Sequence, residues 1–168
     1  MNCRLPEAGD KHILMAYVQE HVDNGEKSIS ASMGLNSTDY AAWLEKIQHN
    51  ASVGDETWGR SLLYLCFDQM KLVGLLSIRY ELPQELKNQY GDIGYGVRPS
   101  ERNKGYATRM LQYGLEVCKE KGMDQVILGC YQENGASVRL IEKSGGVLIA
   151  ENENRTEGRK SLYYRIGL

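Results

Sequence analysis

The chain of 168 residues lacks the patterns that mark several large classes of protein. No stretch approaches the roughly 18 consecutive apolar residues of a membrane-spanning helix, and the first residues, MNCRLPEAGDK, contain no apolar leader segment. We therefore expect a cytoplasmic protein without a membrane partner. The formal net charge of −2 argues against the broad basic surface that nucleic-acid-binding proteins display, so we expect no nucleic-acid partner.

The chain also lacks the residue spacings of common metal and redox sites. Its cysteines form no CxxC pair, and three of the four lie in apolar runs, where a thiol behaves as a small hydrophobe. We predict that all four are reduced core residues. They are Cys3, Cys66, Cys118 and Cys130. The three histidines have no cysteine or carboxylate at ligand spacing, so we predict no metal site.

The length suits one core of ordinary size, and we predict a single domain over residues 1–168. Hydrophobic periodicity and turn residues divide its first half into recognisable elements. The pattern predicts a short strand at residues 3–5, helices at 10–25 and from 38 onward, a loop at 28–36, and an antiparallel hairpin of residues 61–67 and 72–80. Residues 81–90 contain Pro83 and several charges, which favour an exposed loop or short helix near a cleft, a candidate substrate lid.

The second half alternates strands and helices. The pattern predicts a strand at residues 92–97, a helix from Gly105 or Tyr106 to residue 121, a strand at 125–130, a helix from Asn134 to the glycines at 145–146, and strands at 147–150 and 162–166 around a charged turn at 151–160. Together these elements predict an α/β (α+β) fold with a mixed, mainly antiparallel sheet.

Four cations crowd the start of the predicted helix near Gly105. They are Arg98, Arg102, Lys104 and Arg109. A helix N-terminus is already positive because its first N–H groups have no intrahelical partner, so an anion should relieve this charge. Gly105 allows a close backbone approach and Ala107 adds little bulk, as a diphosphate requires. The alternative is a solvated helix start rich in Lys and Arg.

The six residues RNKGYA, from Arg102 to Ala107, match neither the dinucleotide GxGxxG motif nor the Gly-Lys-Ser/Thr ending of a P-loop. They resemble the acetyl-CoA pyrophosphate loop of the GNAT N-acetyltransferases, R/Q-x-x-G-x-G/A, placed after a strand that ends in V-x-P. The order of the later elements strengthens the resemblance, because Asn134-Gly135-Ala136-Ser137 opens a helix that ends in Glu-Lys-Ser-Gly-Gly. It covers residues 61–168 well and the first sixty by pattern only. Bacterial predicted acetyltransferases with a GYxVRPSERxKGYA segment are similar.

The resemblance implies a GNAT-like central sheet flanked by helices, in which two parallel strands, here residues 92–97 and 125–130, splay to admit acetyl-CoA. It implies direct transfer of the acetyl group to a small-molecule or peptide amine in a ternary complex, by a monomer or homodimer. The implied cofactor-binding residues are Tyr95, Val97, Arg98, Arg102, Asn103, Lys104, Gly105, Tyr106, Ala107, Thr108, Asn134 and Ser137. Asn134 and Ser137 are equally typical of a helix cap.

The chemistry requires a base for the ammonium, donors for the oxyanion and a proton for the leaving sulfur. The family implies backbone N–H groups around Val97 as the donors. Asp92 is the first candidate base and Glu81 the second, ahead of Glu85, although each is also typical of a solvated surface carboxylate. These acidic residues together indicate a cationic acceptor.

The leaving group is where the chain departs from the family pattern. Many relatives carry a Tyr at the position of Ile141. We place Tyr131 first as the substitute acid, with Tyr95, Tyr163 and Tyr164 as alternatives, and at most one of the last two can face the cleft, because strand residues alternate. A thiolate with a pKa of about 8.5 can also leave without full protonation.

Two other classes of function remain open at this stage. One is a catalytically impaired regulatory domain that binds acyl-CoA. The other is an anion-binding interaction module unrelated to CoA.

Overall fold

The computed structural model describes residues 1–154 and 158–168, apart from the side chains of residues 88 and 154. The strands are β1 (Asn2–Arg4), β2 (Ser61–Asp68), β3 (Lys71–Arg79), β4 (Ile93–Val97), β5 (Gln125–Tyr131), β6 (Val147–Asn154) and β7 (Arg159–Gly167). The helices are α1 (Lys11–Asp23), α2 (Tyr40–Ser52), α3 (Gln84–Tyr90), α4 (Tyr106–Glu120) and α5 (Gly135–Lys143), with 3-10 turns at Ala8–Asp10 and Pro99–Glu101.

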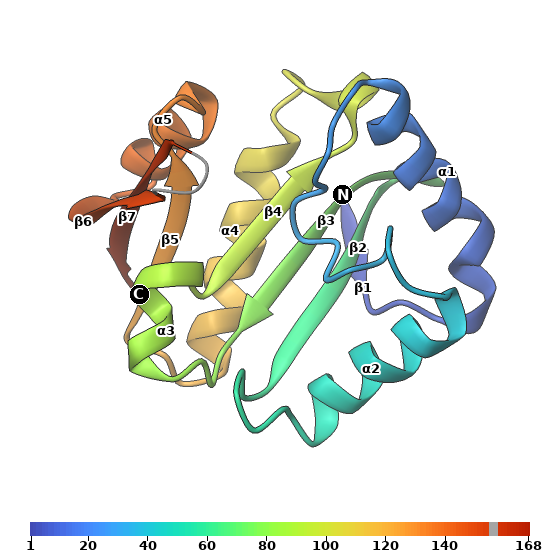
Figure 1. Ribbon diagram of the computed structural model, residues 1–168, viewed down its shortest axis with the longest axis horizontal. Helices are drawn as coiled ribbons and strands as arrows, with labels where there is room; N and C mark the ends of the chain where they lie inside the picture. The colour runs from blue at the N-terminus through green and yellow to red at the C-terminus, as the bar shows by residue number, and fades with distance from the viewer. Residues whose placement is uncertain (155–157) are drawn as a thin grey trace.

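The strands form two antiparallel sheets, one in the order β1-β2-β3-β4 and the other in the order β5-β7-β6. Strands β4 and β5 point the same way and diverge along their length, as Figure 1 shows, and no ladder joins them. The predicted mixed, mainly antiparallel α/β architecture with two splayed parallel strands is confirmed. We call the wedge between β4 and β5 the V.

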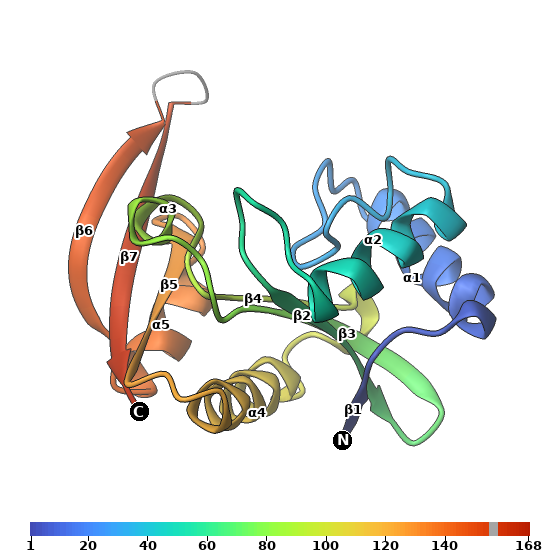
Figure 2. The ribbon, with the colours of Figure 1, turned by 90° about the horizontal axis from the view of Figure 1, so that it is seen from below.

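Helices α1 and α2 cover one face of the first sheet and α4 covers the other (Figure 2). Two apolar clusters fill these layers. One contains Leu14, Tyr17 and Trp43 of the helices together with apolar residues of β2 and β3. The other includes Met110 and Leu111 of α4. Because β2 and β3 are buried on both faces, they are nearly continuous apolar runs instead of alternating ones.

The largest error in the predicted boundaries concerns the last hairpin. Strand β6 continues to Asn154 and β7 already begins at Arg159, so much of the expected charged turn is strand. Opposite charges face each other there, and Lys160 forms an ion pair with Glu151. This pairing accommodates charged residues in a ladder that hydrophobicity alone did not predict. The rest of the predicted turn, residues 155–157, lies outside the described residues.

None of the described helices has the length and apolar composition that a bilayer span requires. The four cysteines are free thiols, of which Cys66 and Cys118 are fully buried and Cys3 and Cys130 partly buried. Burial raises the pKa of Cys118 to about 12, so this thiol is inert at neutral pH.

Candidate active site

Asp92 joins the two sheets at the closed end of the V. Its backbone N–H donates to the carbonyl of Ile127 on β5 at 2.6 Å, and its Oδ2 accepts from the Ile127 N–H at 2.7 Å. The residue is 0% exposed, with Lys87 Nζ 3.4 Å from Oδ1. Burial raises the pKa of this carboxyl, against the hydrogen bond from Ile127 and the charge of Lys87. Asp92 therefore links β4 to β5 through hydrogen bonds of both its backbone and its side chain.

Beyond Asp92, the N–H groups on the outer edge of β4 have no hydrogen-bond partner among the described residues. The Asp92 carbonyl accepts from Arg79 N–H at 2.7 Å, and Arg98 N–H donates to the Val73 carbonyl at 2.8 Å, so these even-numbered positions bond to β3. Hydrogen bonding alternates along an antiparallel ladder. The N–H groups of Tyr95 and Val97 consequently face the V.

A cavity of about 650 Å³ lies between the open end of the V and the start of α4. Gly105 is the N-cap of α4 with φ 81°, and no side chain caps this end of the helix. A Cβ at Gly105 would touch nothing within 4 Å, so the glycine is required by its left-handed backbone and leaves the approach to the first-turn N–H groups open. An uncapped helix N-terminus beside a cavity is suited to an anion.

Carboxylates already neutralise several of the cations around this helix start. Arg102 bonds Glu26 at 2.7 and 3.0 Å and the Val97 carbonyl at 3.2 Å. Burial of Glu26 opposes ionisation, but its hydrogen bonds to Arg102, His21 and Asn24 outweigh that effect and hold its pKa at about 2. This ionised carboxylate ties the end of α1 to the loop before α4.

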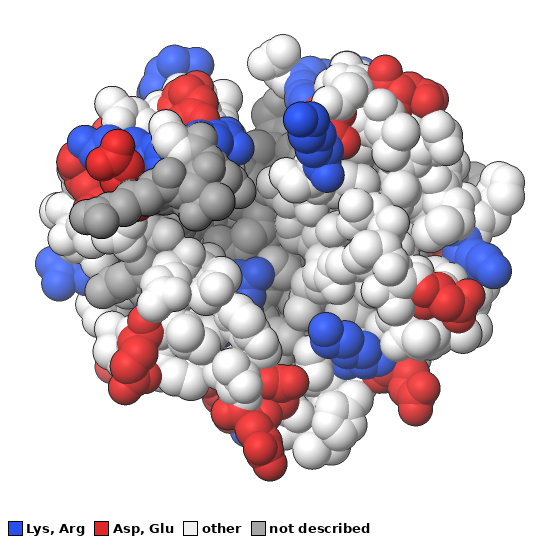
Figure 3. Space-filling view, viewed as in Figure 1, with Lys and Arg blue, Asp and Glu red and all other residues white. Residues whose placement is uncertain are grey.

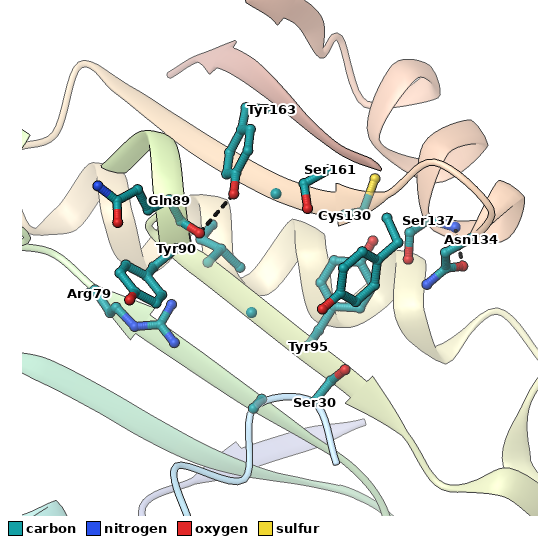
Figure 4. A pocket seen from close by; sticks show the side chains of 15 residues that line it. Ser30, Arg79, Gln89, Tyr90, Tyr95, Cys130, Asn134, Ser137, Ser161 and Tyr163 are labelled. Carbon is teal, nitrogen blue, oxygen red and sulfur yellow. Dashed lines mark hydrogen bonds between the residues drawn. The ribbon is translucent and has the colours of Figure 1, made fainter. Parts of the chain in front are cut away.

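A second cavity, of about 290 Å³, occupies the V closer to Asp92. Figure 4 shows Arg79 and Tyr90 at one end and Tyr95, Asn134 and Ser137 at the other. Both cavities are lined by Ser30, Tyr95, Tyr131, Asn134 and Ser137, so they meet toward the open end of the V. In the space-filling view of Figure 3, the surface is hollowed between the part of the molecule that contains the first sheet and the part that contains the second.

The sequence matches the Acetyltransferase (GNAT) family over residues 32–146. The chain belongs to the GNAT acetyltransferase family. The predicted family is confirmed, and with it the enzyme class and acetyl-CoA as the cofactor that this family uses. A comparison with curated protein sequences finds no match.

Solved structures with the same fold include several N-acetyltransferases. A ribosomal alpha-N-protein acetyltransferase in complex with coenzyme A is 17% identical, with a TM-score of 0.74 and coverage of 99% of this chain and 93% of that one. A ribosomal-protein-alanine N-acetyltransferase from Brucella melitensis is 18% identical, with a TM-score of 0.71 and full coverage of both chains. An N-acetyltransferase from Staphylococcus aureus Mu50 is 18% identical, with a TM-score of 0.71 and coverage of 99% and 97%. At these identities the likeness shows the fold alone.

Most of the residues that the GNAT motif implied for the cofactor line the larger cavity. They are Tyr95, Val97, Arg102, Asn103, Gly105, Tyr106, Ala107, Thr108, Asn134 and Ser137. Arg98 and Lys104 do not line it, because Arg98 forms an ion pair with Glu20 and Lys104 bonds Glu101 at 3.0 Å. Asn134 also caps α5, since its Oδ1 accepts from Ser137 N–H at 3.2 Å, so cap and cavity wall are compatible roles.

The candidate bases do not line either cavity. Asp92 lines neither cavity, and Glu81 is exposed and pairs with Arg60 at 2.5 Å. Glu85 does not line either cavity. Among the described residues no carboxylate lines the smaller cavity, so the expectation of a cationic acceptor loses its basis.

The candidate acids are better placed. Tyr131 lines both cavities, and the guanidinium carbon of Arg159 lies 3.4 Å from its ring centroid. The hydroxyl of Tyr95 is enclosed and makes no hydrogen bond of standard geometry among the described residues, although the side chain of Ser137 lies beside it. Tyr163 faces the smaller cavity and donates to the Gln89 carbonyl at 2.8 Å, whereas Tyr164 bonds Glu142 at 3.3 Å on the other side of β7.

Ile141, which stands at the family's Tyr position, is 1% exposed and belongs to the core. It lines neither cavity, so the structure gives a Tyr at this position no open path to the site.

Sequence reasoning missed much of the wall of the smaller cavity. Ser30 and Ala31 come from an aperiodic loop that crosses the V, where Ser30 O would lie 2.7 Å from a Cβ on Gly96. Arg79 ends an apolar strand and carried no motif. The only available signal was the predicted lid, since Gln89 and Tyr90 of α3 do line this cavity.

Proposed function

We propose that the chain transfers the acetyl group of acetyl-CoA directly to a primary amine in one ternary complex. Acetyl-CoA occupies the larger cavity and the amine occupies the smaller one. The observation that carries the proposal is the meeting of the two cavities at the open end of the V, beside the free N–H edge of β4.

The residues present fit acetyl-CoA. The uncapped first turn of α4 and the guanidinium of Arg102 receive the pyrophosphate, and the left-handed Gly105 keeps this approach open. Arg98 and Lys104 contribute only long-range charge, because their side chains are held by Glu20 and Glu101. Bound acetyl-CoA supplies an acetyl group activated as a thioester.

The protein's own part in the reaction is to orient both substrates and to stabilise charge. One of the N–H groups on this edge, that of Tyr95 or that of Val97, donates to the acetyl oxygen, where negative charge develops in the transition state. The two groups lie about 7 Å apart along the strand, so a single oxygen does not reach both. In the absence of a lining carboxylate, water held among the hydroxyls of Ser161 and Tyr163 takes the ammonium proton. Tyr131 or Tyr95 gives a proton to the departing sulfur. The enclosed hydroxyl, which makes no hydrogen bond of standard geometry among the described residues, favours Tyr95.

Because no carboxylate among the described residues lines the smaller cavity, a second function stays under consideration. This is a regulatory domain that binds acetyl-CoA without turnover. Release of free CoA thiol separates the two functions. We expect wild-type protein to bind acetyl-CoA and to release thiol in the presence of a pool of primary amines. Binding without thiol release over a broad pool would favour the regulatory domain.

A pair of arginine variants tests the position of the cofactor. Arg102→Ala should weaken acetyl-CoA binding about tenfold to a hundredfold in calorimetric titrations, because a charge-assisted contact is lost. Arg98→Ala is the matched control, since it also leaves a glutamate unpaired but lies off the cavity. Equal affinities in the two variants would contradict the proposed position.

A further inference from the structure

The smaller cavity has an unusual charge for a site that accepts an amine. Of the described residues that line it, Arg79 is the one charged side chain, and four tyrosines form much of the remaining wall. Figure 4 shows the guanidinium of Arg79 directed into the cavity beside Tyr90. A cationic wall repels a polyamine or any amine that carries a second positive charge.

No carboxylate among the described residues forms an ion pair with the guanidinium of Arg79. Its Nη1 donates to the Gly91 carbonyl at 3.1 Å, and the other N–H groups of the guanidinium have no hydrogen-bond partner among the described residues. The nearest buried acid, Asp92, is not in salt-bridge contact with Arg79, since its carboxylate is held by Ile127 N–H and Lys87. Two or more donors of a planar fork are thus available to a ligand.

The guanidinium is also poorly hydrated. Burial lowers the pKa of Arg79, and the charge of Asp92 opposes this effect only in part. A desolvated cation at the end of a cavity gains more from an anionic ligand than an exposed one does. The planar, bidentate geometry of a carboxylate matches this group best.

We infer that the acceptor is a small primary amine that also carries a carboxylate, with the carboxylate on Arg79 and the amine directed toward Tyr95. The inference rests on the proposed function and narrows its substrate class to amino acids and related amino carboxylates. Arg79 lies level with Asp92, and Tyr95 is three residues further along β4, about 10 Å away along the strand. The tyrosine rings between them offer apolar faces to the carbon chain of the acceptor.

The test compares matched amines in the thiol-release assay. Each α-amino acid is paired with its primary amide, and glycine, β-alanine, 4-aminobutyrate and 6-aminohexanoate vary the distance between amine and carboxylate. Spermidine represents the cationic acceptors. We expect at least one amino carboxylate to exceed its amide about tenfold to a hundredfold in kcat/KM. Equal rates for acids and amides, or a preference for spermidine, would overturn the inference.

Arginine variants then locate the effect. Arg79→Gln should remove the preference for the acid over the amide, and Arg79→Lys should keep part of it, while acetyl-CoA affinity stays unchanged in both. Arg60→Gln is the matched control. Arg60 directly precedes Ser61, which pairs with Arg79 in the hairpin, and its side chain is exposed. If Arg79→Gln lowers the rates of acid and amide equally, Arg79 has only a structural role and the inference fails.

A binding measurement separates this inference from the proposed activity. Saturation-transfer NMR of the same acids and amides with the CoA-bound protein needs no turnover. If no amine releases thiol, the proposed function fails, yet selective binding of acids that is lost in Arg79→Gln still supports the inference. Equal binding of acids and amides, or binding of neither, overturns it.

Discussion

The two cavities of the V are built in different ways. About half of the residues that line the larger one come from one stretch, residues 95–108, which includes the uncapped start of α4. The smaller one is lined by a few residues from each of several elements, namely β3, β4, β5, β7, α3, the start of α5 and the loop after α1. In the proposed arrangement, the pyrophosphate therefore binds to backbone N–H groups at the start of α4, whereas the acceptor is held by side chains. Changes in the two cavities should consequently have separable effects.

The largest effect is expected from Gly105→Val. A side chain here meets no protein atom but occupies the approach to the N–H groups of α4, so acetyl-CoA binding should become undetectable in a calorimetric titration. Gly122→Val, at the other end of α4, is the control. Gly122 has φ 78° against 81° for Gly105, and its Cβ would also touch nothing within 4 Å. Similar cofactor affinities in the two variants would contradict a pyrophosphate site at the start of α4.

The next largest effect is expected from Tyr95→Phe or Tyr131→Phe. Loss of a general acid should lower kcat by about a hundredfold or more while acetyl-CoA affinity is retained. Tyr164→Phe is the comparison, since that hydroxyl bonds Glu142 at 3.3 Å and lines neither cavity. Wild-type kcat in both Tyr95→Phe and Tyr131→Phe would indicate that the sulfur leaves as a thiolate, without a proton from a protein side chain.

A smaller effect is expected at the closed end of the V. Asp92→Ala leaves the buried N–H of Ile127 without its side-chain acceptor, and the free energy of unfolding should fall by about 1 to 3 kcal/mol in urea denaturation. Asp92→Asn keeps an acceptor oxygen and should retain most of the stability and the turnover. A loss of kcat of about a hundredfold or more in a well-folded Asp92→Asn would restore Asp92 as the base.

The smallest effect is expected from Glu26→Gln. Release of Arg102 from its partner should raise acetyl-CoA affinity a few-fold and lower stability at pH 7 by about 1 kcal/mol. Because the pKa of Glu26 is lowered to about 2 in the fold, its contribution to stability is complete above about pH 4.5 and is lost as the pH falls toward 2. The stability difference between wild type and variant should vanish over that range in acid denaturation. A difference that persists at pH 2 would contradict this ion pair.

The sequence predicted the elements with local signals well. Asp10 and Asn24 flank α1, and Gly105 and Asn134 are the N-caps of α4 and α5, because caps and left-handed residues depend on nearby backbone alone. Residues 38 and 39 show the usual uncertainty, since Asp39 and not Thr38 caps α2. Most of the predicted residues that line the larger cavity followed from the same local signals.

The acceptor cavity could not be predicted in this way. Asp92 resembled a catalytic base in a strand, but its partner Ile127 lies 35 residues away in the chain. Arg98 and Lys104 resembled cofactor ligands, but Glu20 and Glu101 hold their side chains elsewhere. Arg79 carried no motif. The direction of a side chain and the identity of its distant partner are set by tertiary packing, which a short pattern does not contain.

The backbone amide signals of α4 and β4 provide the most direct test of the division between the cavities. In NMR titrations, CoA should shift the amides of Tyr106, Ala107 and Thr108 and also those of Tyr95 and Val97. Acetylpantetheine, which lacks the pyrophosphate, should shift only the β4 pair. If CoA leaves the α4 amides unmoved, or if both ligands move them equally, the pyrophosphate does not bind at the start of α4.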